Sequence, residues 1–460
     1  PALRFGFAWD VFGRARTAIR GGFGKFHNRG SVDQVLFYTG QPPVSYVRSS
    51  YYSPITQIPQ SKDIAAISPA SAGGITGKQK LEAAYNGSLN IQQNVGFQTV
   101  VEVGWVFNLR RHAPGYAREV NAIPIFSRYD PANANPMMGY LAGNASGKAL
   151  PDNFFRPLKG LGSITRINFE LSSYYHSLQA SVRRNMRNGL SYGVSYTFGK
   201  TMGITGASPY FADEARNRGP MYSPVPHVIS IYYVYEMPKP GKRFNLRPLG
   251  WVTDNWVISG ITEFRSNRKT GVPAISFTGY NPITNPLIEW TGSAETARMN
   301  VVGNPELPKD QVSFKGGPAT EIGPNGTPGN QILNMSAFAI PYPCSYEAAS
   351  TPQLGIGPSV SCFGNAGAGS IITIPWTRVN NWNVTLSKYF PLGKERRGLM
   401  FRMETYNLFN HTQFSGANLT PQYDWSSWKS GKLVQTNGQL GRFTSALNPR
   451  NISMSLRLEF

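Results

Sequence analysis

Long apolar runs are missing from this 460-residue sequence, in which no stretch approaches the ~18 consecutive apolar residues that a transmembrane helix needs. Charged residues are also scarce, at 15%, whereas Gly and Pro number 48 and 35 and aromatic residues make up 13%. Because these abundant residues favour turns and strands over helices, the composition predicts an all-β protein. A membrane-spanning strand remains compatible with it, since such a strand needs only ~10 residues of alternating hydrophobicity.

Signatures of metal binding and catalysis are sparse as well. The five histidines lie far apart without HExxH-type spacing, no GxSxG nucleophile motif occurs, and the GGFG at 21–24 lies in a strand-like segment. We therefore expect no enzyme activity, no catalytic or metal-binding residue and no cofactor.

The two cysteines, Cys344 and Cys362, lie in one Gly- and Pro-rich segment. In an oxidising extracellular or periplasmic compartment they are expected to form a disulfide that closes a loop.

Alternating hydrophobicity recurs along the chain in about thirteen segments that pair as hairpins. The clearest hairpin spans Tyr174–Met202 and turns at Arg187, Asn188 and Gly189. Its second arm alternates Leu190, Tyr192, Val194, Tyr196 and Phe198 with serine, threonine or glycine. Further strands are expected at 3–10, 18–26, 84–94, 98–108, 227–237, 255–264, 272–277, 381–390, 399–409 and 439–445, and 279–370 is interpreted as a long loop.

One face of these strands is apolar and the other carries small polar side chains. This suits a wall between lipid and a water-filled lumen, because a soluble sandwich usually exposes charged residues on its outer face. The sequence predicts an antiparallel transmembrane β-barrel with long extracellular loops, in which 1–460 form a single domain. A soluble, secreted protein made of several sandwiches is the alternative fold.

The last strand, Pro449–Phe460, has the strictest alternation. Its apolar side consists of Ile452, Met454, Leu456, Leu458 and Phe460. This ending resembles the terminal strand of bacterial outer-membrane barrels, whose closing aromatic residue is read by the barrel-assembly machinery. The resemblance implies that these five residues form an assembly signal.

Three stretches carry a wider resemblance: 10–29 (DVFGRARTAIRGGFGKFHNR), 172–202 (SSYYHSLQASVRRNMRNGLSYGVSYTFGKTM) and 382–414 (WNVTLSKYFPLGKERRGLMFRMETYNLFNHTQF). They resemble the Oar-like group of TonB-dependent receptors, abundant in Acidobacteria, and 406–414 is the most specific piece. The resemblance implies an outer-membrane transporter with a carboxypeptidase-regulatory-like domain, a plug and a barrel of ~22 strands. The chain would be the carboxy-terminal portion of that barrel, and TonB would act through the missing amino-terminal region.

Six charged residues are expected on the lumen side of their strands: Glu102, Glu263, Arg402, Glu404, Arg457 and Glu459. They could contact the plug or line a ligand path. We expect the pair at 402 and 404 to form ion pairs with the pair at 457 and 459 across neighbouring strands. His411 is expected to order a turn at the barrel rim.

The net charge of +21 bears on the partners. Basic residues are scattered, and no arginine-rich helix or zinc-knuckle spacing occurs, so no nucleic-acid partner is expected. A basic barrel better fits the anionic lipopolysaccharide of the Gram-negative outer membrane, or an anionic ligand in the lumen. The sequence leaves two functions open: a receptor that takes up an unidentified ligand, and a surface adhesion or glycan-binding barrel without transport.

Overall fold

The computed structural model describes fourteen stretches of the chain. They are residues 2–28, 71–75, 80–113, 116–123, 152–204, 218–221, 225–271, 276–278, 299–308, 331–339, 371–373, 377–393, 397–424 and 434–460. Cys344 and Cys362 lie outside them. Within the described residues, no helix is both long enough and apolar enough to cross a membrane.

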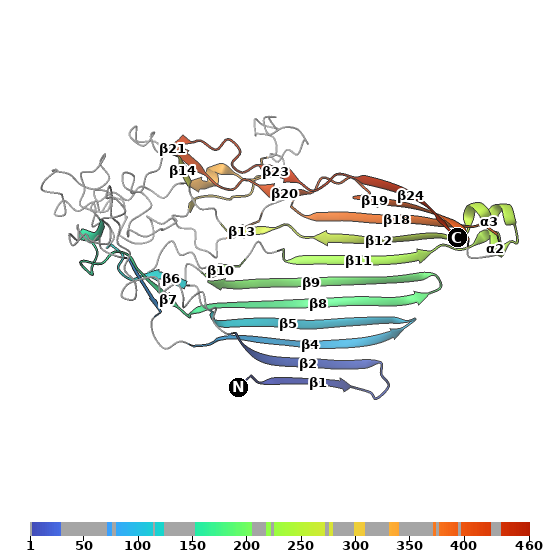
Figure 1. Cartoon of the computed structure of the whole chain (residues 1–460), viewed down its shortest axis with the longest axis horizontal. Helices are drawn as coiled ribbons and strands as arrows, with labels where there is room; N and C mark the ends of the chain where they lie inside the picture. The colour runs from blue at the N-terminus through green and yellow to red at the C-terminus, as the bar shows by residue number, and fades with distance from the viewer. Residues whose placement is uncertain are drawn as a thin grey trace, which may run out of the picture.

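A single antiparallel sheet of twelve strands dominates the molecule (Figure 1). In spatial order its strands are β1 (Arg4–Asp10), β2 (Thr17–Asn28), β4 (Glu82–Gly96), β5 (Thr99–Ala113), β8 (Leu171–Arg187), β9 (Leu190–Ile204), β11 (His227–Glu236), β12 (Trp256–Arg265), β18 (Val379–Pro391), β19 (Gly398–Tyr406) and β24 (Asn451–Glu459), and the short β10 (Arg218–Pro220) also pairs with β9. Spatial order therefore follows chain order, as in an up-and-down meander. β1 and β24 are the two ends of this order.

The two ends of the sheet differ in their connections (Figure 1). At one end, which we call the hairpin end, short turns join β1 to β2, β4 to β5, β8 to β9 and β18 to β19, and the C-terminus lies there. The β8–β9 turn has positive φ at Asn188 (52°) and Gly189 (76°), the backbone that a two-residue Asn-Gly turn requires. The opposite end carries the long connections and is called the loop end.

The connection between β11 and β12 is different from the other turns at the hairpin end. It forms two short helices, α2 (Pro240–Arg243) and α3 (Arg247–Thr253), which extend beyond the strand ends (Figure 1). Each helix has a proline in its first turn, where the missing amide hydrogen costs nothing. Alternating hydrophobicity does not predict these helices.

A second layer of small sheets lies at the loop end. It contains β3 (Ala72–Ile75), β6 (Tyr116–Glu119), β7 (Ile164–Asn168), β13 (Lys269–Gly271), β14 (Ser276–Thr278), β15 (Asn300–Val301), β16 (Phe338–Ala339), β17 (Ile371–Thr373), β20 (Phe414–Ala417), β21 (Gln422–Asp424), β22 (Val434–Gln435) and β23 (Phe443–Ala446), with the 3-10 turns η3 (Asp152–Phe154) and η6 (Met335–Ala337). A cluster of buried apolar residues lies here: Met299, Ile332, Leu333, Ala337, Phe338 and Phe443. This packed core is therefore at the loop end, and not within the large sheet.

Most expected strands are confirmed, and three expectations need correction. The described parts of 279–370 contain β15, β16 and every residue of the core cluster except Phe443, so they are not simply an irregular loop. Of the strand expected at 439–445, only 443–445 are strand, as part of β23, which pairs with β20 outside the large sheet, and 439–441 form a turn. β19 ends at Tyr406 because Asn407 has a φ of 51°, which a strand cannot continue. Residues 272–275 of another expected strand lie outside the described part.

The register gives the sheet two chemically distinct faces, because directly opposite residues of antiparallel strands lie on the same face. One row across nine strands consists of Trp9, Ile19, Ile91, Val103, Ala180, Tyr196, Ile229, Phe264 and Asn380. The row one residue further along consists of Asp10, Ala18, Gln92, Glu102, Ser181, Ser195, Ser230, Glu263 and Asn381. We call these faces the apolar face and the polar face.

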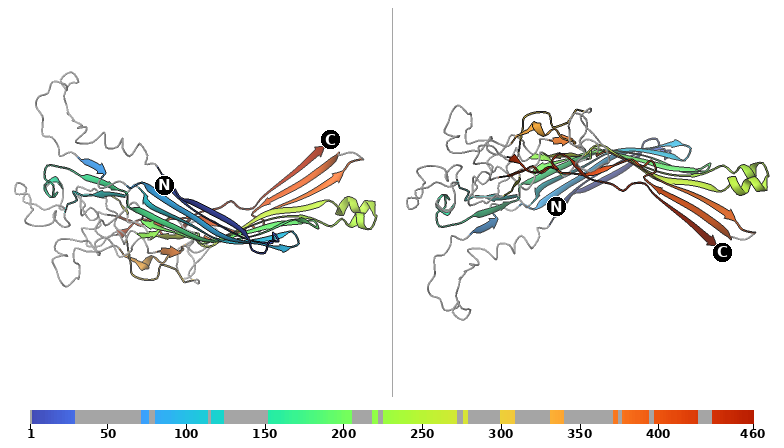
Figure 2. Two further views of the ribbon diagram at one scale, coloured as in Figure 1. Left: turned by 90° about the horizontal axis from the view of Figure 1, so that it is seen from below. Right: turned by 90° about the horizontal axis from the view of Figure 1, so that it is seen from above.

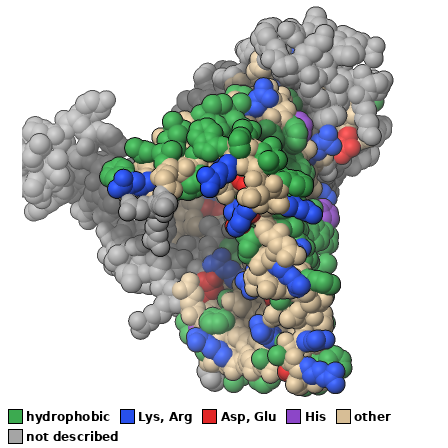
Figure 3. Space-filling model, turned by 90° about the vertical axis from the view of Figure 1, so that its right-hand side faces the viewer, with side chains coloured by type: hydrophobic (Ala, Val, Ile, Leu, Met, Phe, Trp, Pro, Cys, Tyr) green, Lys and Arg blue, Asp and Glu red, His purple; other side chains and the backbone are tan. Residues whose placement is uncertain are grey.

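The sheet is also strongly curved. Figure 2 shows β18, β19 and β24 rising away from the plane of the central strands. Seen from the hairpin end, the curved sheet bounds a hollow (Figure 3). Acidic and basic side chains lie inside this hollow, whereas hydrophobic side chains gather along the outer side. The polar face is therefore the concave face of the sheet.

Candidate functional site

The candidate site is the polar face of the large sheet together with its two ends. All six charged residues expected to face a lumen lie on this face. Glu102 and Glu263 belong to the same row, separated by Ser181, Ser195 and Ser230. Glu404 lies opposite Thr385 and Ser453, and Arg402 lies opposite Ser387 and Ser455. Arg457 and Glu459 lie opposite Met400 and Gly398.

Three ion pairs on the polar face form within single strands. Arg402 contacts Glu404 two residues along β19, and the Nε of Arg457 lies 3.8 Å from Oε1 of Glu459 on β24. The same spacing recurs on β12, where Nη2 of Arg265 is 2.6 Å from Oε1 of Glu263. Residues two apart on a strand point to the same side, which brings their long side chains together.

The expected ion pairs across β19 and β24 are therefore wrong. The two strands are neighbours, but the register places Arg402 opposite Ser455 and places Arg457 opposite Met400. The charges at 457 and 459 are consequently closer to the hairpin end than those at 402 and 404. Alternation predicted the face of each residue correctly, whereas the register was needed to predict the partner.

Hydrogen-bonded amides and a further ion pair occupy the polar face near the loop end. Asn108 of β5 donates to Asn86 of β4, directly opposite. Arg110 pairs with Glu82, whose other carboxylate oxygen accepts a 3.3 Å bond from Asn28 Nδ2. The concave face thus presents hydroxyl, amide and paired ionic groups, a chemistry suited to water or to a polar protein surface.

A polar hook joins β19 to the start of β24, and it is formed by the stretch most specific to the family resemblance. Asn407 is buried, and its Nδ2 donates to the carbonyls of His411 (2.9 Å) and Asn448 (3.3 Å). Its Oδ1 accepts the amide of His411 at 3.0 Å. Asn410 Oδ1 accepts the amide of Arg450 at 2.9 Å. This turn is thus ordered by the Asn407 side chain, whereas His411, which was expected to order it, contributes its backbone and a 3.3 Å contact between its Nδ1 and the Asn380 carbonyl.

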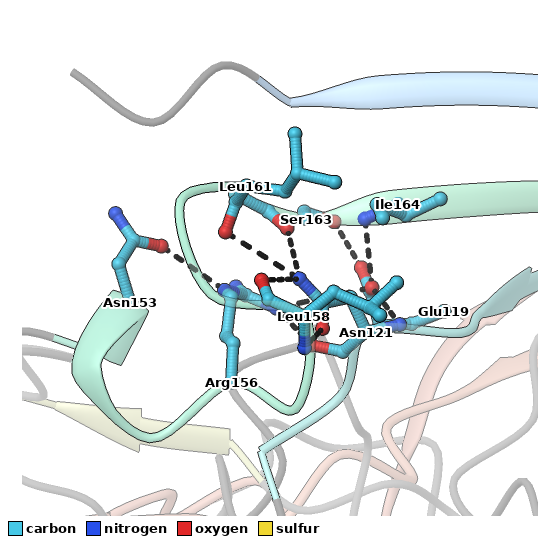
Figure 4. A network of polar contacts seen from close by, with 9 residues as sticks. Glu119, Asn121, Asn153, Arg156, Leu158, Leu161, Ser163 and Ile164 are labelled. Carbon is cyan, nitrogen blue, oxygen red and sulfur yellow. Dashed lines mark hydrogen bonds and ion pairs between the residues drawn. The ribbon is translucent and has the colours of Figure 1, made fainter. Parts of the chain in front are cut away.

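A second polar network fastens the long connection between β5 and β8 (Figure 4). Glu119 accepts hydrogen bonds from the amides of Asn121 (2.8 Å) and Ile164 (2.7 Å). The side chain of the fully buried Asn121 bonds to the backbone of 158–162, and Arg156 Nη1 donates to the Asn121 carbonyl at 2.7 Å. Side chains complete the network, since Ser163 donates to Glu119 and Arg156 Nε donates to Asn153 Oδ1 at 3.1 Å. Because these polar groups bond to the loop itself, the network orders the loop and leaves little capacity for a ligand.

An open hollow of about 430 Å³ lies in the loop-end layer. Its lining is Ala417, Asn418, Leu419, Thr420, Gln422, Asn437 and Thr444. Asn437 is held in place by bonds from its Nδ2 to Asn418 Oδ1 (3.0 Å) and to the Thr420 carbonyl (2.8 Å). The hollow offers amide and hydroxyl groups, which suit a neutral polar ligand more than an ion.

The hairpin end contains a charged pair that the sequence analysis missed. Asp254 caps the N-terminus of α2 although it follows α3 in the chain. Its carboxylate accepts hydrogen bonds from the backbone amides of Gly241 (2.8 Å) and Lys242 (2.9 Å). Burial raises the pKa of Asp254, but these two bonds, the Thr253 hydroxyl and the Lys388 charge together bring the pKa below its ordinary value of 3.8. Lys388 Nζ donates to the carbonyls of Val252 (2.9 Å) and Asp254 (2.8 Å) at the end of α3. The paired Pro-Gly and Pro-Leu-Gly segments were the available signal for these helices.

β24 is the last strand in the order of the sheet and lies at its edge. Its four apolar residues, Ile452, Met454, Leu456 and Leu458, are exposed on the apolar face, and Phe460 is 99% exposed at the hairpin end. Such an edge has free backbone groups for a further strand or a partner.

Comparison with known proteins places these features in a family. A family model described as an outer membrane beta-barrel domain matches residues 2–453. No curated protein sequence matches the chain. Similar solved structures include the outer membrane transporter YddB from Escherichia coli (TM-score 0.45, 9% identity), the siderophore receptor PirA from Acinetobacter baumannii (0.40, 10%) and the FrpB iron transporter from Neisseria meningitidis (0.39, 9%). Each alignment covers 99% of this chain but only 40%, 40% and 38% of those chains, respectively.

Proposed function

Because the chain belongs to the outer membrane beta-barrel family and is located in the Gram-negative outer membrane, we propose that it is the barrel wall of a TonB-dependent receptor that takes up an unidentified ligand. In this proposal the sheet is part of a closed barrel of ~22 strands, with the apolar face toward lipid and the polar face toward the lumen. The Oar-like group is the proposed subtype, on the strength of the three resembling stretches.

The observation that carries the proposal is the row across nine strands on the concave face, which is polar at every position except Ala18. Serine, glutamine and paired charges on that face would be costly against a dry core. They fit a lumen occupied by water and by a polar plug domain. The loop-end hollow of amides and hydroxyls supports a ligand site on the extracellular side.

The experiment is performed on the full-length gene product in a Gram-negative host. Photo-crosslinking in living cells tests whether the protein contacts TonB, with a strain lacking TonB as the control. We expect a crosslinked complex of the protein with TonB in the host that contains TonB, and no such complex in the strain that lacks it. Absence of the adduct, together with glycan or surface binding that is unchanged without TonB, would support the second candidate, a surface adhesion or glycan-binding barrel.

The six charges on the polar face are proposed to contact the plug or to line the ligand path. A swap variant, Arg402→Glu with Glu404→Arg, keeps the ion pair within β19 but exchanges the two charge positions. If the ion pair only stabilises β19, the swap leaves the contacts between β19 and the plug unchanged. If it contacts the plug, crosslinks between plug and β19 are lost although the barrel folds normally. The matched control is the same kind of swap at Glu82 and Arg110, an ion pair on the same face that is not among the six charges.

Two assembly partners belong to the same proposal. The exposed edge of β24 and Phe460 form the signal for the barrel-assembly machinery. Lipopolysaccharide is the proposed contact of the outer leaflet, for which the basic excess of the chain is suitable.

A further inference from the structure

The α2–α3 segment, defined as Met237–Asn255, differs from an ordinary turn in both position and composition. It extends beyond the hairpin end of the sheet (Figure 1), which is the periplasmic end in barrels of this kind. It contains four basic residues and one acidic residue, and the acidic residue is Asp254, which is already engaged in capping α2. The segment therefore presents positive charge only.

Packing places α3 on the apolar face of the sheet. The Trp251 ring lies 5.2 Å from the Phe390 ring, and Phe390 shares its row with Leu399 and Leu458. Lys388 is also on this face, in a row with Trp256, Phe401 and Leu456, yet it is only 3% exposed.

The reason for that burial is α3 itself. The Lys388 ammonium bonds to the last carbonyls of α3 and lies 4.9 Å and 4.8 Å from the ring centres of Trp256 and Phe390. A lysine that would otherwise face lipid is thus covered by the helix. The outer side of α3 consequently continues the lipid-facing surface of the sheet.

The outer side of the segment combines two kinds of exposed side chain. The apolar ones are Phe244, Leu246, Leu249, Trp251 and Val252, which are between 37% and 65% exposed. The basic ones are Lys239, Lys242, Arg243 and Arg247, all exposed. Figure 3 shows hydrophobic and basic side chains side by side at the end of the molecule where α2 and α3 lie.

We propose that the α2–α3 segment is an interfacial anchor that binds the periplasmic leaflet of the outer membrane. Its apolar side chains enter the boundary between headgroups and acyl chains, and its lysines and arginines bind phospholipid phosphates. Interfacial helices elsewhere use this combination of apolar and basic side chains. Phospholipid is the occupant favoured over a periplasmic protein because the segment is continuous with the lipid-facing surface and because its charge is complementary to phosphate. The proposal does not depend on transport.

The test uses the full-length protein reconstituted in vesicles of phosphatidylethanolamine and phosphatidylglycerol. An environment-sensitive dye is attached at Val252→Cys in a background with Cys344→Ser and Cys362→Ser. The control carries the dye at Arg14→Cys, an exposed position in the β1–β2 turn. Lipids brominated near the headgroup are expected to quench the dye at 252 but not the dye at 14, whereas aqueous iodide should do the reverse.

Removal of the charges gives an independent measurement. A variant with Lys239→Gln, Lys242→Gln, Arg243→Gln and Arg247→Gln is compared with the parent protein. The measurement is how strongly each protein retains phosphatidylglycerol relative to phosphatidylcholine in mixed micelles. We expect the preference to fall by up to about fivefold for each charge removed. Equal quenching at 252 and 14, or a strong iodide effect at 252, would overturn the proposal and would indicate a surface left free for a periplasmic protein. An unchanged lipid preference would overturn the phosphate contacts.

Discussion

Replacement of Asn407 by alanine should loosen the attachment of the closing strand. Asn407 is 5% exposed, and its side chain makes three hydrogen bonds, two to His411 and one to Asn448. Its φ of 51° lies in the left-handed region, which asparagine tolerates better than alanine. The substitution therefore removes polar contacts and introduces backbone strain at the same position.

The magnitude follows from these two contributions. Three hydrogen bonds at about 1 kcal/mol each give about 3 kcal/mol. The left-handed backbone adds about 1 kcal/mol for alanine, so the total loss in the free energy of unfolding is about 4 kcal/mol. Asn407→Gly keeps the backbone unstrained and should cost about 3 kcal/mol.

The assay is urea unfolding of the full-length protein in detergent or lipid, followed by heat-modifiable gel migration. Asn188 provides the matched control, because its φ is 52° but it lies exposed in the β8–β9 turn. Asn188→Ala should therefore cost about 1 kcal/mol, the strain alone. Equal losses in the free energy of unfolding for Asn407→Ala and Asn188→Ala would show that the side-chain hydrogen bonds of Asn407 do not stabilise the attachment of β24.

Three further substitutions test other parts of the molecule. Asp254→Asn should lower stability at neutral pH. Because the pKa of Asp254 is below 3.8 in the folded state, the wild-type advantage is present above 3.8 and disappears as the pH falls through the folded value, which unfolding titrations would detect. Gly241→Ala should cost about 1–3 kcal/mol, because a Cβ there collides with the Gly250 backbone, whereas Gly438→Ala, facing open space, should be neutral in the same unfolding assay. Phe460→Ala should reduce the yield of assembled barrel in membranes without changing the stability of the protein that does assemble.

The strands could be predicted from the sequence because their chemistry is periodic. In β9, Leu190, Val194 and Phe198 recur on one face, and no tertiary information is needed to assign them. The turn at Asn188 and Gly189 was equally predictable, since only a positive-φ pair closes a two-residue hairpin of the correct twist. The same periodicity predicts which residues form each face of the sheet, and it places the six charged residues together on one face.

Contacts between distant segments could not be predicted in this way. The burial of Lys388 depends on α3, which is more than 130 residues earlier in the chain. The core cluster joins Phe443 to 299–338, through segments without periodicity. Alternation also gives no register, so the partners of Arg402 and Arg457 required the strand pairing itself.

The charges on the polar face are difficult to explain by the stability of the sheet. Arg402 and Arg457 have side chains that are 52% and 77% exposed, and exposed ion pairs contribute only about 0–1 kcal/mol. Serine and threonine lie opposite Arg402 and Glu404, and Met400 and Gly398 lie opposite Arg457 and Glu459, so the fold accepts neutral residues at these positions. Each pair is also neutral as a unit, and therefore adds hydrogen-bonding groups to the concave face without adding net charge. These groups are best explained by contact with a polar partner inside the curve of the sheet, which the swap variant on β19 tests directly.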